Sequence, residues 1–444
     1  MENIRVMDSD EQVEMFNYTE CDNVAPVEVK KTRGIVIDKI TKNQIVGSFG
    51  YTETYTKEDE EVLGNLFSNL SSGEWTFFYS LESTLLRVFY HHDQWYLATH
   101  KKLDAFKSRW SCRSTFGELF VEALSRESGK KPDEVMDWLH GFLDKEKVYC
   151  FLLKSNQENR IVCQVNLKRP KIVYLGSFDK GPDVVLDTSP LEITGMELAR
   201  PEVVPFSEVD TIPRILEKVE TIDHNEYQGL LAIHIPTQKN IKILNTEYKK
   251  YYDIRGNNPN LRFRYLEIRN DPERVRMLYF LYPKSAELFD QLEDTIHKIS
   301  RMIYHFYVNR YIKNQFITLP KEEFQLMKKC HNWYLLDRKN HRIFSQKVLE
   351  MMASEEPLHL YKMIRRFTLN QNLAMHQTMN AKRAFVHTSS RPPHSFAAVL
   401  SAPAPAPVAI DTALVTDSSA TAMATATVAT ATVITETTVT NTSS

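Results

Sequence analysis

The 444-residue chain lacks three features that would mark it as a membrane, secreted or metal-cluster protein. It has no run of 18 or more apolar residues, so no membrane span is predicted. Its first residues, MENIRVMDSDEQVEMF, are acidic and contain no apolar stretch, which argues against a secretory signal. The five cysteines are scattered without a CxxC pair, so neither a disulfide framework nor a stable metal cluster is predicted. We therefore expect an intracellular protein without a membrane partner.

The net charge of −2 combines parts of unlike charge. Residues 301–390 carry 15 Lys and Arg against 6 Asp and Glu, a net charge of +9. Residues 401–444 contain no Lys or Arg and three acids, and the first 300 residues sum to −9. An acidic body followed by a basic segment indicates that an anionic partner, such as RNA or another nucleic acid, contacts the second half.

Composition and pattern predict an α+β protein with four regions. The hydrophobic fraction of 42% and the charged fraction of 25% are typical of globular proteins. Residues 1–29 are interpreted as an N-terminal extension, 30–282 as an antiparallel-sheet domain and 283–390 as a small, basic, all-helical domain. Residues 391–444 are rich in Ala, Thr, Pro and Ser and poor in aromatics, so a disordered tail is expected there.

Strand-length apolar runs dominate the predicted sheet domain. Two pairs of strands are predicted in GIVIDKITKNQIVGSF and LLRVFYHHDQWYLATH, the second turning at His91-His92-Asp93-Gln94. Single strands follow in VYCFLLKS, RIVCQVNL and KIVYLGSF, and helices in FGELFVEALSRESG and PDEVMDWLHGFLDKE. Beyond Pro283 the pattern becomes helical, with an apolar face over residues 288–306 and helix starts at Pro320 and Pro357.

Four segments concentrate residue types that could carry chemistry. Two of them are SLESTLLRVFY from Ser80, continued by LATHKK, and FLLKSNQENRIVC from Phe151. The other two are EYQGLLAIH from Glu226 and IKILNTEYKK from Ile241. In this order the segments resemble the nucleotidyltransferase core shared by ATP-dependent ligases and mRNA capping enzymes, and most of all the phage-type RNA ligases.

The resemblance rests on short matching motifs. Asn159-Arg160-Ile161-Val162 matches the family's Asn-Arg-Ile-Val, Gly229-Leu-Leu-Ala232 matches its Gly-x-x-Ala element, and Lys242 with Tyr248 matches its last motif. Thr32-Arg33-Gly34-Ile35 resembles the strand that precedes the core. The family appends a helical C-terminal domain. THKKLDAFKSRW and NTEYKKYYDIRGNNPNLRFRYLEIR also resemble uncharacterised proteins of large DNA viruses, which would place the protein in the cytoplasm or nucleus of a host cell.

The resemblance implies a chemistry and also marks where this chain departs from it. In the family a lysine amine attacks ATP, with Mg²⁺, to form a lysine–AMP adduct, and the AMP is passed to an RNA 5′-phosphate before a 3′-hydroxyl displaces it. The family has a nucleophilic lysine, three acids, a glycine and a second lysine at six positions where this chain has other residues. They are Ser80, Glu82, Ser83, Leu153, Gln228 and Leu244. The fold is therefore expected to persist while adenylation is lost.

The candidate site residues follow from the same alignment. Lys102 opens a Lys-x-Asp-Ala sequence and is the fallback nucleophile if the protein is an active ATP-dependent RNA ligase joining a 5′-phosphate to a 3′-hydroxyl. The predicted nucleotide-binding residues are Glu82, Arg87, Arg160, Gln228 and Lys242. Arg87 and Arg160 could equally be solvated strand residues.

No metal ligand is predicted from the sequence. His91, His92 and His100 are interpreted as exposed residues at or beside a turn, because no matching ligand spacing accompanies them. Three functional hypotheses remain from the sequence. The first is a catalytically degenerate, RNA-ligase-like protein that binds nucleotide or RNA. The second is a non-enzymatic structural or packaging protein of a large DNA virus that binds nucleic acid through residues 301–390; a capping guanylyltransferase is a third option that also needs the missing lysine.

Overall fold

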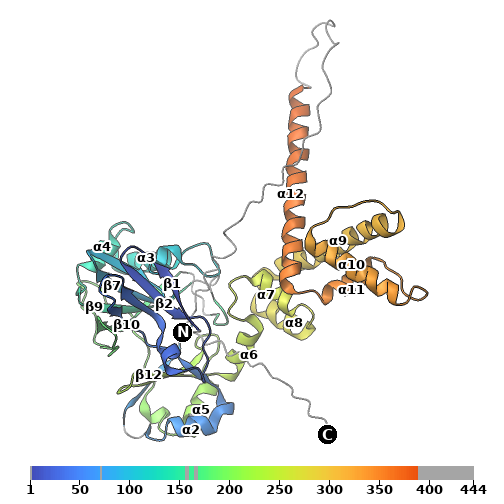
Figure 1. Cartoon of the computed structure of the whole chain (residues 1–444). Coiled ribbons are helices and arrows are strands. Elements are labelled where there is room, and N and C mark those ends of the chain that lie inside the picture. The colour runs from blue at the N-terminus through green and yellow to red at the C-terminus, as the bar shows by residue number, and fades with distance from the viewer. Residues whose placement is uncertain (1–2, 71–72, 156–159, 165–168, 389–444) are drawn as a thin grey trace. The chain divides into compact units, whose positions relative to one another are not determined.

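The chain divides into two units in the computed structural model, the first ending at Leu261 and the second beginning at Arg262. The structure describes residues 3–70, 73–155, 160–164 and 169–388, the stretch 374–388 by its backbone alone. The tail predicted for residues 391–444 lies outside the described residues. Figure 1 shows the strands gathered in the first unit and long helices in the second.

The N-terminal residues form part of a sheet. Four antiparallel strands are ordered β1-β2-β3-β4. Their bounds, with the short helix before β3, are β1 Ile4–Ser9, β2 Val13–Tyr18, α1 Val27–Lys31, β3 Arg33–Asp38 and β4 Gln44–Val46. Alternate residues of β2, Val13 and Met15, are fully buried, which is the period-two pattern of a strand with one covered face. The predicted extension thus supplies two strands to the fold.

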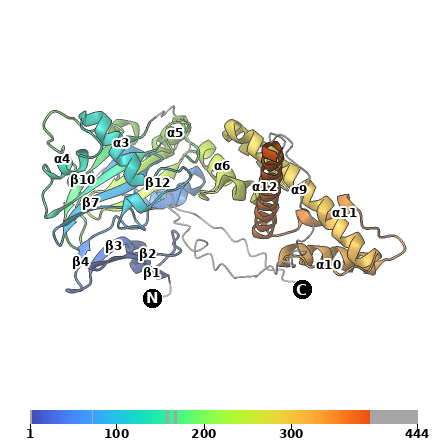
Figure 2. The same cartoon turned by 90° about the horizontal axis from the view of Figure 1, so that it is seen from above.

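The central sheet is fully antiparallel, in the order β10-β9-β7-β8. Its strands and the helices beside it are β7 Thr84–His91, β8 Gln94–Ala98, α3 Phe116–Ser128, α4 Val135–His140, β9 Lys147–Lys154 and β10 Lys171–Asp179. Helices α3 and α4 cover one face, where Leu86 and Val88 join the core (Figure 2). On the other face Leu85 and Phe89 pack with residues of the first sheet. Arg87, between them in β7, therefore points toward the first sheet.

The third sheet brings distant parts of the sequence together. Its order is β5-β12-β11-β6, with β5 parallel to β12 and the other pairs antiparallel. The elements of this layer are β5 Glu53–Tyr55, α2 Glu60–Leu66, β6 Trp75–Tyr79, α5 Ile212–Thr221, β11 Gly229–His234 and β12 Lys239–Leu244. Helices α2 and α5 share a hydrophobic core with the sheet. Helix α6 (Thr246–Arg255) follows β12, its first turn capped by the Asn245 side chain.

The second unit is helical. Its helices are α7 Leu261–Ile268, α8 Pro272–Leu281, α9 Ala286–Tyr307, α10 Lys321–Leu336, α11 Ser345–Ala353 and α12 Pro357–Thr388. Helix α9 buries Leu292, Ile296, Ile299 and Ile303 at the predicted spacing. The ends of the stripe are shifted by one position, since Phe289 and Tyr307 are buried in place of Leu288 and Phe306. None of the described helices is both long enough and apolar enough to span a bilayer.

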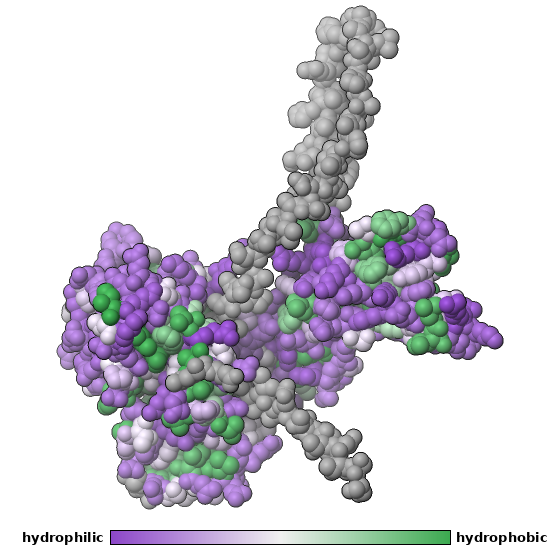
Figure 3. Space-filling view, viewed as in Figure 1, coloured by the Kyte–Doolittle hydropathy of each residue, from purple (hydrophilic) through white to green (hydrophobic). Residues whose placement is uncertain are grey.

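The structure confirms the α+β class and most of the predicted elements, with two corrections. Residues 160–164 of the predicted strand RIVCQVNL are not a strand, because the amides of residues 161–163 are bound by a side chain described below. The continuous helical part of the chain also begins before Pro283, at α6. The tyrosines and charged residues of α6 do not alternate with a clear helical period, so the sequence pattern does not reveal it. The face seen in Figure 3 is mainly hydrophilic, with small apolar patches on both units.

Candidate functional site

Two of the motif segments meet at the ends of neighbouring strands. Ser80 directly follows β6, and Gln228 directly precedes β11. The Gln228 N–H donates to the Ser80 carbonyl at 2.8 Å, and the Ser80 N–H donates to the Gly229 carbonyl at 2.9 Å. The backbone ladder between β6 and β11 thus continues to these residues, and it fixes their side chains next to each other.

Gly229 is required by the close approach of the next strand. Its φ of 141° lies in a region that side-chain-bearing residues rarely adopt. A Cβ at this position would lie 2.1 Å from the Ile243 carbonyl oxygen of β12. The glycine in the Gly-x-x-Ala element therefore allows β12, which carries Lys242, to pair tightly beside Gln228.

Gln228 is the centre of a buried hydrogen-bond network. Its amide oxygen accepts from the Ser80 hydroxyl at 3.2 Å and from the Lys242 ammonium at 2.7 Å. Its amide nitrogen donates to the Tyr248 hydroxyl at 3.0 Å. Gln228 and Tyr248 are fully buried, and Ser80 and Lys242 nearly so. An amide can accept on one side and donate on the other, whereas the glutamate of the resemblance could only accept.

Glu82 ends this network on the loop between β6 and β7. The Tyr248 hydroxyl donates to Glu82 Oε2 at 3.1 Å. The same oxygen accepts from the Val162 and Cys163 amides at 2.9 and 3.2 Å, and the other oxygen accepts from the Ile161 amide. A carboxylate that binds three successive amides holds this segment in a turn-like path. We call Ser80, Glu82, Gln228, Lys242 and Tyr248 the Gln228 network.

Lys242 lies in an unusual electrostatic setting for a lysine. Burial first, and then the nearby Arg33 guanidinium, lower the pKa of the Lys242 amine to about 7. The Glu82 carboxylate acts in the opposite direction. The Lys242 amine therefore exists in comparable charged and neutral fractions near neutral pH.

Lys242 also belongs to a second group, which we call the cationic cluster: Arg33 of β3, Arg87 of β7, Lys101 after β8 and Lys242 of β12. Arg33 lowers the pKa of Lys101 and of Lys242 in addition to the larger effect of burial. Burial, followed by Arg33, also lowers the pKa of Arg87 to about 10. Like charges this close, in three different layers of the unit, create a local positive potential.

The two arginines of the cluster are nearly inaccessible to solvent. Arg87 is 2% exposed, and its terminal nitrogens donate to the Gly47 and Thr99 carbonyls at 3.2 Å each. Arg33 donates to the Gly50 carbonyl at 3.1 Å and to the Thr52 hydroxyl at 3.2 Å. The Nε atoms of both arginines have no hydrogen-bond partner. The interpretation of Arg87 as a solvated strand residue is therefore wrong.

The other sequence-predicted residues have separate surroundings. The Lys102 ammonium lies 3.3 Å from Asp8 Oδ1 in β1, and the Leu103 amide donates to the other oxygen at 2.9 Å. Arg160 is half-buried and donates to the Val162 carbonyl at 3.2 Å. Asn159 lies outside the described residues. The site assignments of Lys102 and Arg160 remain predictions.

Apolar packing explains two of the substituted positions. Leu153 of β9 and Leu244 of β12 are both buried in the core that α3 shares with the central sheet. An acid or a lysine at these positions would be surrounded by hydrocarbon. His100 also differs from its interpretation as an exposed residue, since it is 6% exposed and lies beside Arg33 and Arg87, and burial lowers its pKa well below the usual value.

Sequence reasoning missed Arg33 and Lys101 as site residues. In the sequence, Arg33 is recognisable only as part of Thr32-Arg33-Gly34-Ile35, the motif of the strand that precedes the core. Gly34, with φ of 75°, gives the reason for that Arg-Gly pair: a Cβ there would lie 2.8 Å from the His100 backbone and 2.9 Å from an Arg87 nitrogen. The Arg-Gly pair is the signal in the sequence, since a glycine at the start of a strand can mark a place where another backbone approaches closely.

Comparison with known proteins finds viral relatives. The chain is 26% identical over 356 residues to an "Immediate-early protein ICP-46 homolog" of Invertebrate iridescent virus 3, covering 78% of this chain and 75% of the relative. It is 28% identical over 326 residues to the homolog of Invertebrate iridescent virus 6, covering 68% of each. It is 28% identical over 192 residues to "Immediate-early protein ICP-46" of Frog virus 3, covering 41% of this chain and 47% of the relative. No protein-family model matches the chain.

Solved structures similar to this chain include nucleic-acid ligases. A putative ATP-dependent DNA ligase from Aquifex aeolicus shares 14% identity at a TM-score of 0.35, covering 65% of this chain and 72% of the ligase. A lysine-to-alanine variant of the Naegleria gruberi RNA ligase, with ATP and Mn, shares 13% identity at a TM-score of 0.30, covering 47% of this chain and 60% of the ligase.

Proposed function

We propose that this viral-type protein is an RNA-ligase-like nucleotidyltransferase-fold protein that binds nucleotide or RNA phosphates but does not form a lysine–AMP adduct. One observation carries the proposal: Ser80, Gln228 and Lys242, which come from three separate motif segments, share one hydrogen-bond network. The motif segments follow the order of the ligase family along the sequence and also contact one another in the structure. This agreement favours a ligase-like core over an unrelated sheet protein.

The cationic cluster supports phosphate as the ligand. Beyond the larger effect of burial, Arg33 lowers the pKa of Arg87, of Lys101 and of Lys242, so each of these three groups lies near its positive charge. Neither arginine forms an ion pair with a carboxylate in the described part of the chain. A phosphate bound beside the cluster would offset this repulsion.

The loss of adenylation follows from what surrounds Ser80. A serine hydroxyl needs an adjacent base to become a nucleophile. The Ser80 hydroxyl donates instead to the Gln228 amide oxygen, which does not take up a proton at neutral pH. Lys102, the fallback nucleophile, is engaged with Asp8 of the first sheet.

The network does not fit the Mg²⁺ that the resemblance implies. Magnesium prefers carboxylate and other hard oxygen ligands. Glu82 is the acid of the Gln228 network, and both of its oxygens already accept from backbone amides. ATP, if bound, would therefore be held by the cations rather than through a metal bridge at this position.

The alternative proposal is a non-enzymatic nucleic-acid-binding structural protein acting through its basic helices inside the host cell. Several of these cations are already engaged within the second unit. Lys329 pairs with Glu355 at 2.5 Å, and Arg366 pairs with Glu322 and Glu323 at 2.8 and 2.6 Å. We therefore favour the first unit as the place where a phosphate binds.

The proposal is tested by titrating the full chain with ATP, and separately with a 5′-phosphorylated RNA, in a calorimeter. Lys101→Met removes one cation of the cluster, so we expect at least tenfold weaker binding. Lys107→Met is the matched control, because Lys107 is a neighbouring lysine whose side chain is 79% exposed and pairs with Asp104. Equal affinities of the two variants, or no binding of either ligand by the wild type, would contradict the proposal.

A further inference from the structure

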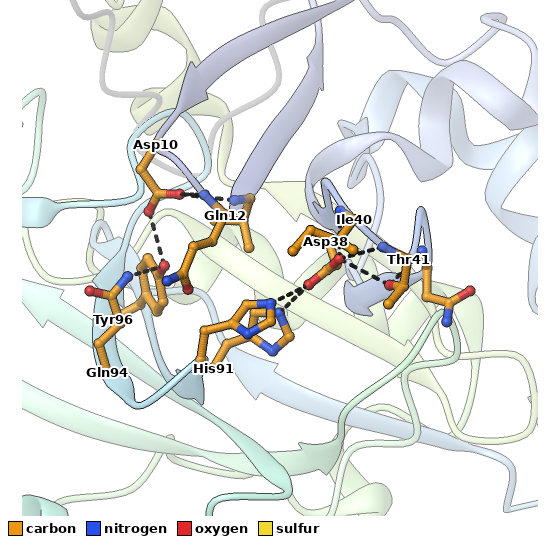
Figure 4. A network of polar contacts seen from close by, with 11 residues as sticks. Asp10, Gln12, Asp38, Ile40, Thr41, His91, Gln94 and Tyr96 are labelled. Carbon is orange, nitrogen blue, oxygen red and sulfur yellow. Dashed lines mark hydrogen bonds and ion pairs between the residues drawn. The ribbon is translucent and has the colours of Figure 1, made fainter.

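Two consecutive histidines converge on one buried carboxylate, away from the cationic cluster. His91 is the last residue of β7, and His92 follows it in the turn to β8. The Nε2 atoms of His91 and His92 lie 2.7 and 2.6 Å from the same oxygen, Asp38 Oδ2 (Figure 4). Asp38 is the last residue of β3, 53 residues earlier in the chain. Among the described residues these three donor atoms form a group within 4.8 Å of one another.

The turn geometry explains how neighbouring histidines can face the same way. Successive side chains of a strand point to opposite faces. Here His92 and Asp93 have φ values of 44° and 60°, and His91 pairs with Gln94, so a two-residue turn with left-handed backbone joins the strands. This backbone brings both rings to the Asp38 side, with ring centroids 4.1 Å apart and planes at 62°.

Asp38 is held rigidly by its other oxygen. Oδ1 accepts from the Ile40 and Thr41 amides at 2.8 and 2.7 Å and from the Thr41 hydroxyl at 3.1 Å. The side chain is 1% exposed, whereas those of His91 and His92 are 17% and 36% exposed. The donors to Oδ1 thus fix the orientation of the carboxylate, and Oδ2 faces the two imidazoles, which are partly exposed.

We propose that Asp38, His91 and His92 form a binding site for a divalent transition-metal ion of the zinc class. Two imidazole nitrogens and one carboxylate oxygen are the ligand set of many three-residue sites for Zn²⁺, Co²⁺, Ni²⁺ or Fe²⁺. Three protein ligands leave open positions for water or for a further ligand.

The observed distances require only a small adjustment to admit a metal. Bonds of about 2.0–2.2 Å in a tetrahedral arrangement separate donor atoms by roughly 3.3 Å. The nitrogens lie 2.6 and 2.7 Å from Oδ2, so each ring has to move outward by less than about 1 Å. The exposed edges of the histidines allow this movement, while the anchored Asp38 stays in place.

The site differs in position and role from the proposed phosphate site. His91 lies four residues beyond Arg87 in β7, which is about 13 Å along a strand. A metal there would join the end of β3 in the first sheet to the β7–β8 turn of the central sheet. Its presence does not depend on whether the cationic cluster binds phosphate.

The test uses the full chain, expressed without a polyhistidine tag and treated with a chelator before dialysis. Zn²⁺ alone is titrated by calorimetry, and Co²⁺ alone by visible absorption, which reports the number and kind of ligands. We expect one equivalent to bind, with at least tenfold weaker binding in His91→Gln and in His92→Gln. Because bound metal stabilises the native state, Zn²⁺ should also raise the melting temperature of the wild type more than that of either variant.

His234→Gln is the matched control, since His234 also pairs with a carboxylate, Glu74, at the end of a strand but belongs to no metal-ligand group among the described residues. It should bind metal as the wild type does. Absence of stoichiometric binding would show that the three residues form only a hydrogen-bonded contact. Undiminished binding in both histidine variants, or a thiolate-to-cobalt absorption band from the cysteines, would also overturn the proposal. Circular dichroism of each variant separates loss of a ligand from loss of folding.

Discussion

At the scale of single residues, Gln228 links three motif segments through one amide group. Its oxygen accepts from Ser80 and Lys242, and its nitrogen donates to Tyr248. All of these contacts are buried, so removing the amide leaves polar groups without partners in a region that water does not reach.

Gln228→Leu should therefore destabilise the protein strongly. We expect a loss of about 3 kcal/mol in the free energy of unfolding, because a buried amine and two hydroxyls lose an interaction at once. Urea unfolding followed by circular dichroism measures this. Gln291→Leu, at an exposed position of α9, is the control and should change stability by less than about 0.5 kcal/mol. A small effect at Gln228 would mean that the network does not hold these segments together.

Lys242 predicts a specific pH dependence of stability. Its pKa is lowered to about 7 by burial, while an unfolded lysine titrates near 10.4, so between these values the unfolded chain binds the extra proton. Stability of the wild type relative to Lys242→Met should thus rise with pH in this window, by about 1.4 kcal/mol per unit. Below about pH 7 the folded amine is charged too, and the difference should level off.

The measurement is urea unfolding of both proteins at about pH 6 and about pH 9, with the stability difference expected to change by roughly 3 kcal/mol. Arg33 contributes to the lowered pKa, so Arg33→Gln should reduce the change. A stability difference that stays constant with pH would contradict the lowered pKa of the Lys242 amine.

At the scale of secondary-structure elements, the pairing of β11 with β12 depends on Gly229. A Cβ there would lie 2.1 Å from a carbonyl oxygen of the neighbouring strand, and the φ of 141° disfavours any side chain. Gly229→Ala should therefore cost several kcal/mol, on the order of 3.

Gly64→Ala is the matched substitution, because Gly64 lies within α2 and its Cβ would meet no atom within 4 Å. Alanine favours the helix there, so we expect unchanged or slightly higher stability, by up to about 1 kcal/mol. Thermal unfolding of the two variants gives the comparison. Similar melting temperatures for both would show that β12 can shift away from Gly229.

The elements also show how far the sequence alone could lead. Apolar alternation predicted β3, β4, β7, β8, β9 and β10, and the Thr115–Glu118 capping pair accompanies the predicted α3. Residues 160–164 have the apolar pattern of a strand because Ile161 and Val162 are buried, yet the amides of residues 161–163 bind Glu82, which is 79 residues away from Ile161. The Glu82 side chain determines the backbone path of this segment, and the hydrophobic periodicity of the segment itself carries no information about so distant a residue.

The same reason limits the prediction of sites. Ser80, Gln228 and Lys242, which the motif alignment singled out, contact one another in the structure. The Asp38–His91–His92 group cannot be recognised from the spacing of ligands along the sequence, because Asp38 lies in another sheet, far from the two histidines in the chain. The site roles stay predictions for all of the candidate residues: Glu82, Arg87, Lys102, Arg160, Gln228 and Lys242.

At the scale of the whole molecule, the boundary between the two units directly follows residues 256–260, a short connection between α6 and α7 that includes Gly256 and Pro259. Brief digestion of the native protein with a low-specificity protease should cut first in this connection and release two stable fragments. Mass spectrometry locates the cut. A first cut near Pro283 instead would favour the later boundary that the sequence pattern indicated.

The central claim is phosphate binding by a ligase-like site that no longer makes a covalent adduct. The most direct test incubates the full chain with ATP labelled at the α-phosphate, in Mg²⁺ and in Mn²⁺. Half of each sample is passed through a protein-binding filter under native conditions, and the other half is denatured and run on a denaturing gel. We predict label retained on the native filter and absent from the denatured polypeptide. Label that stays on the polypeptide after denaturation, and is lost in Lys102→Met or Lys242→Met, would contradict the account and identify a working nucleophile.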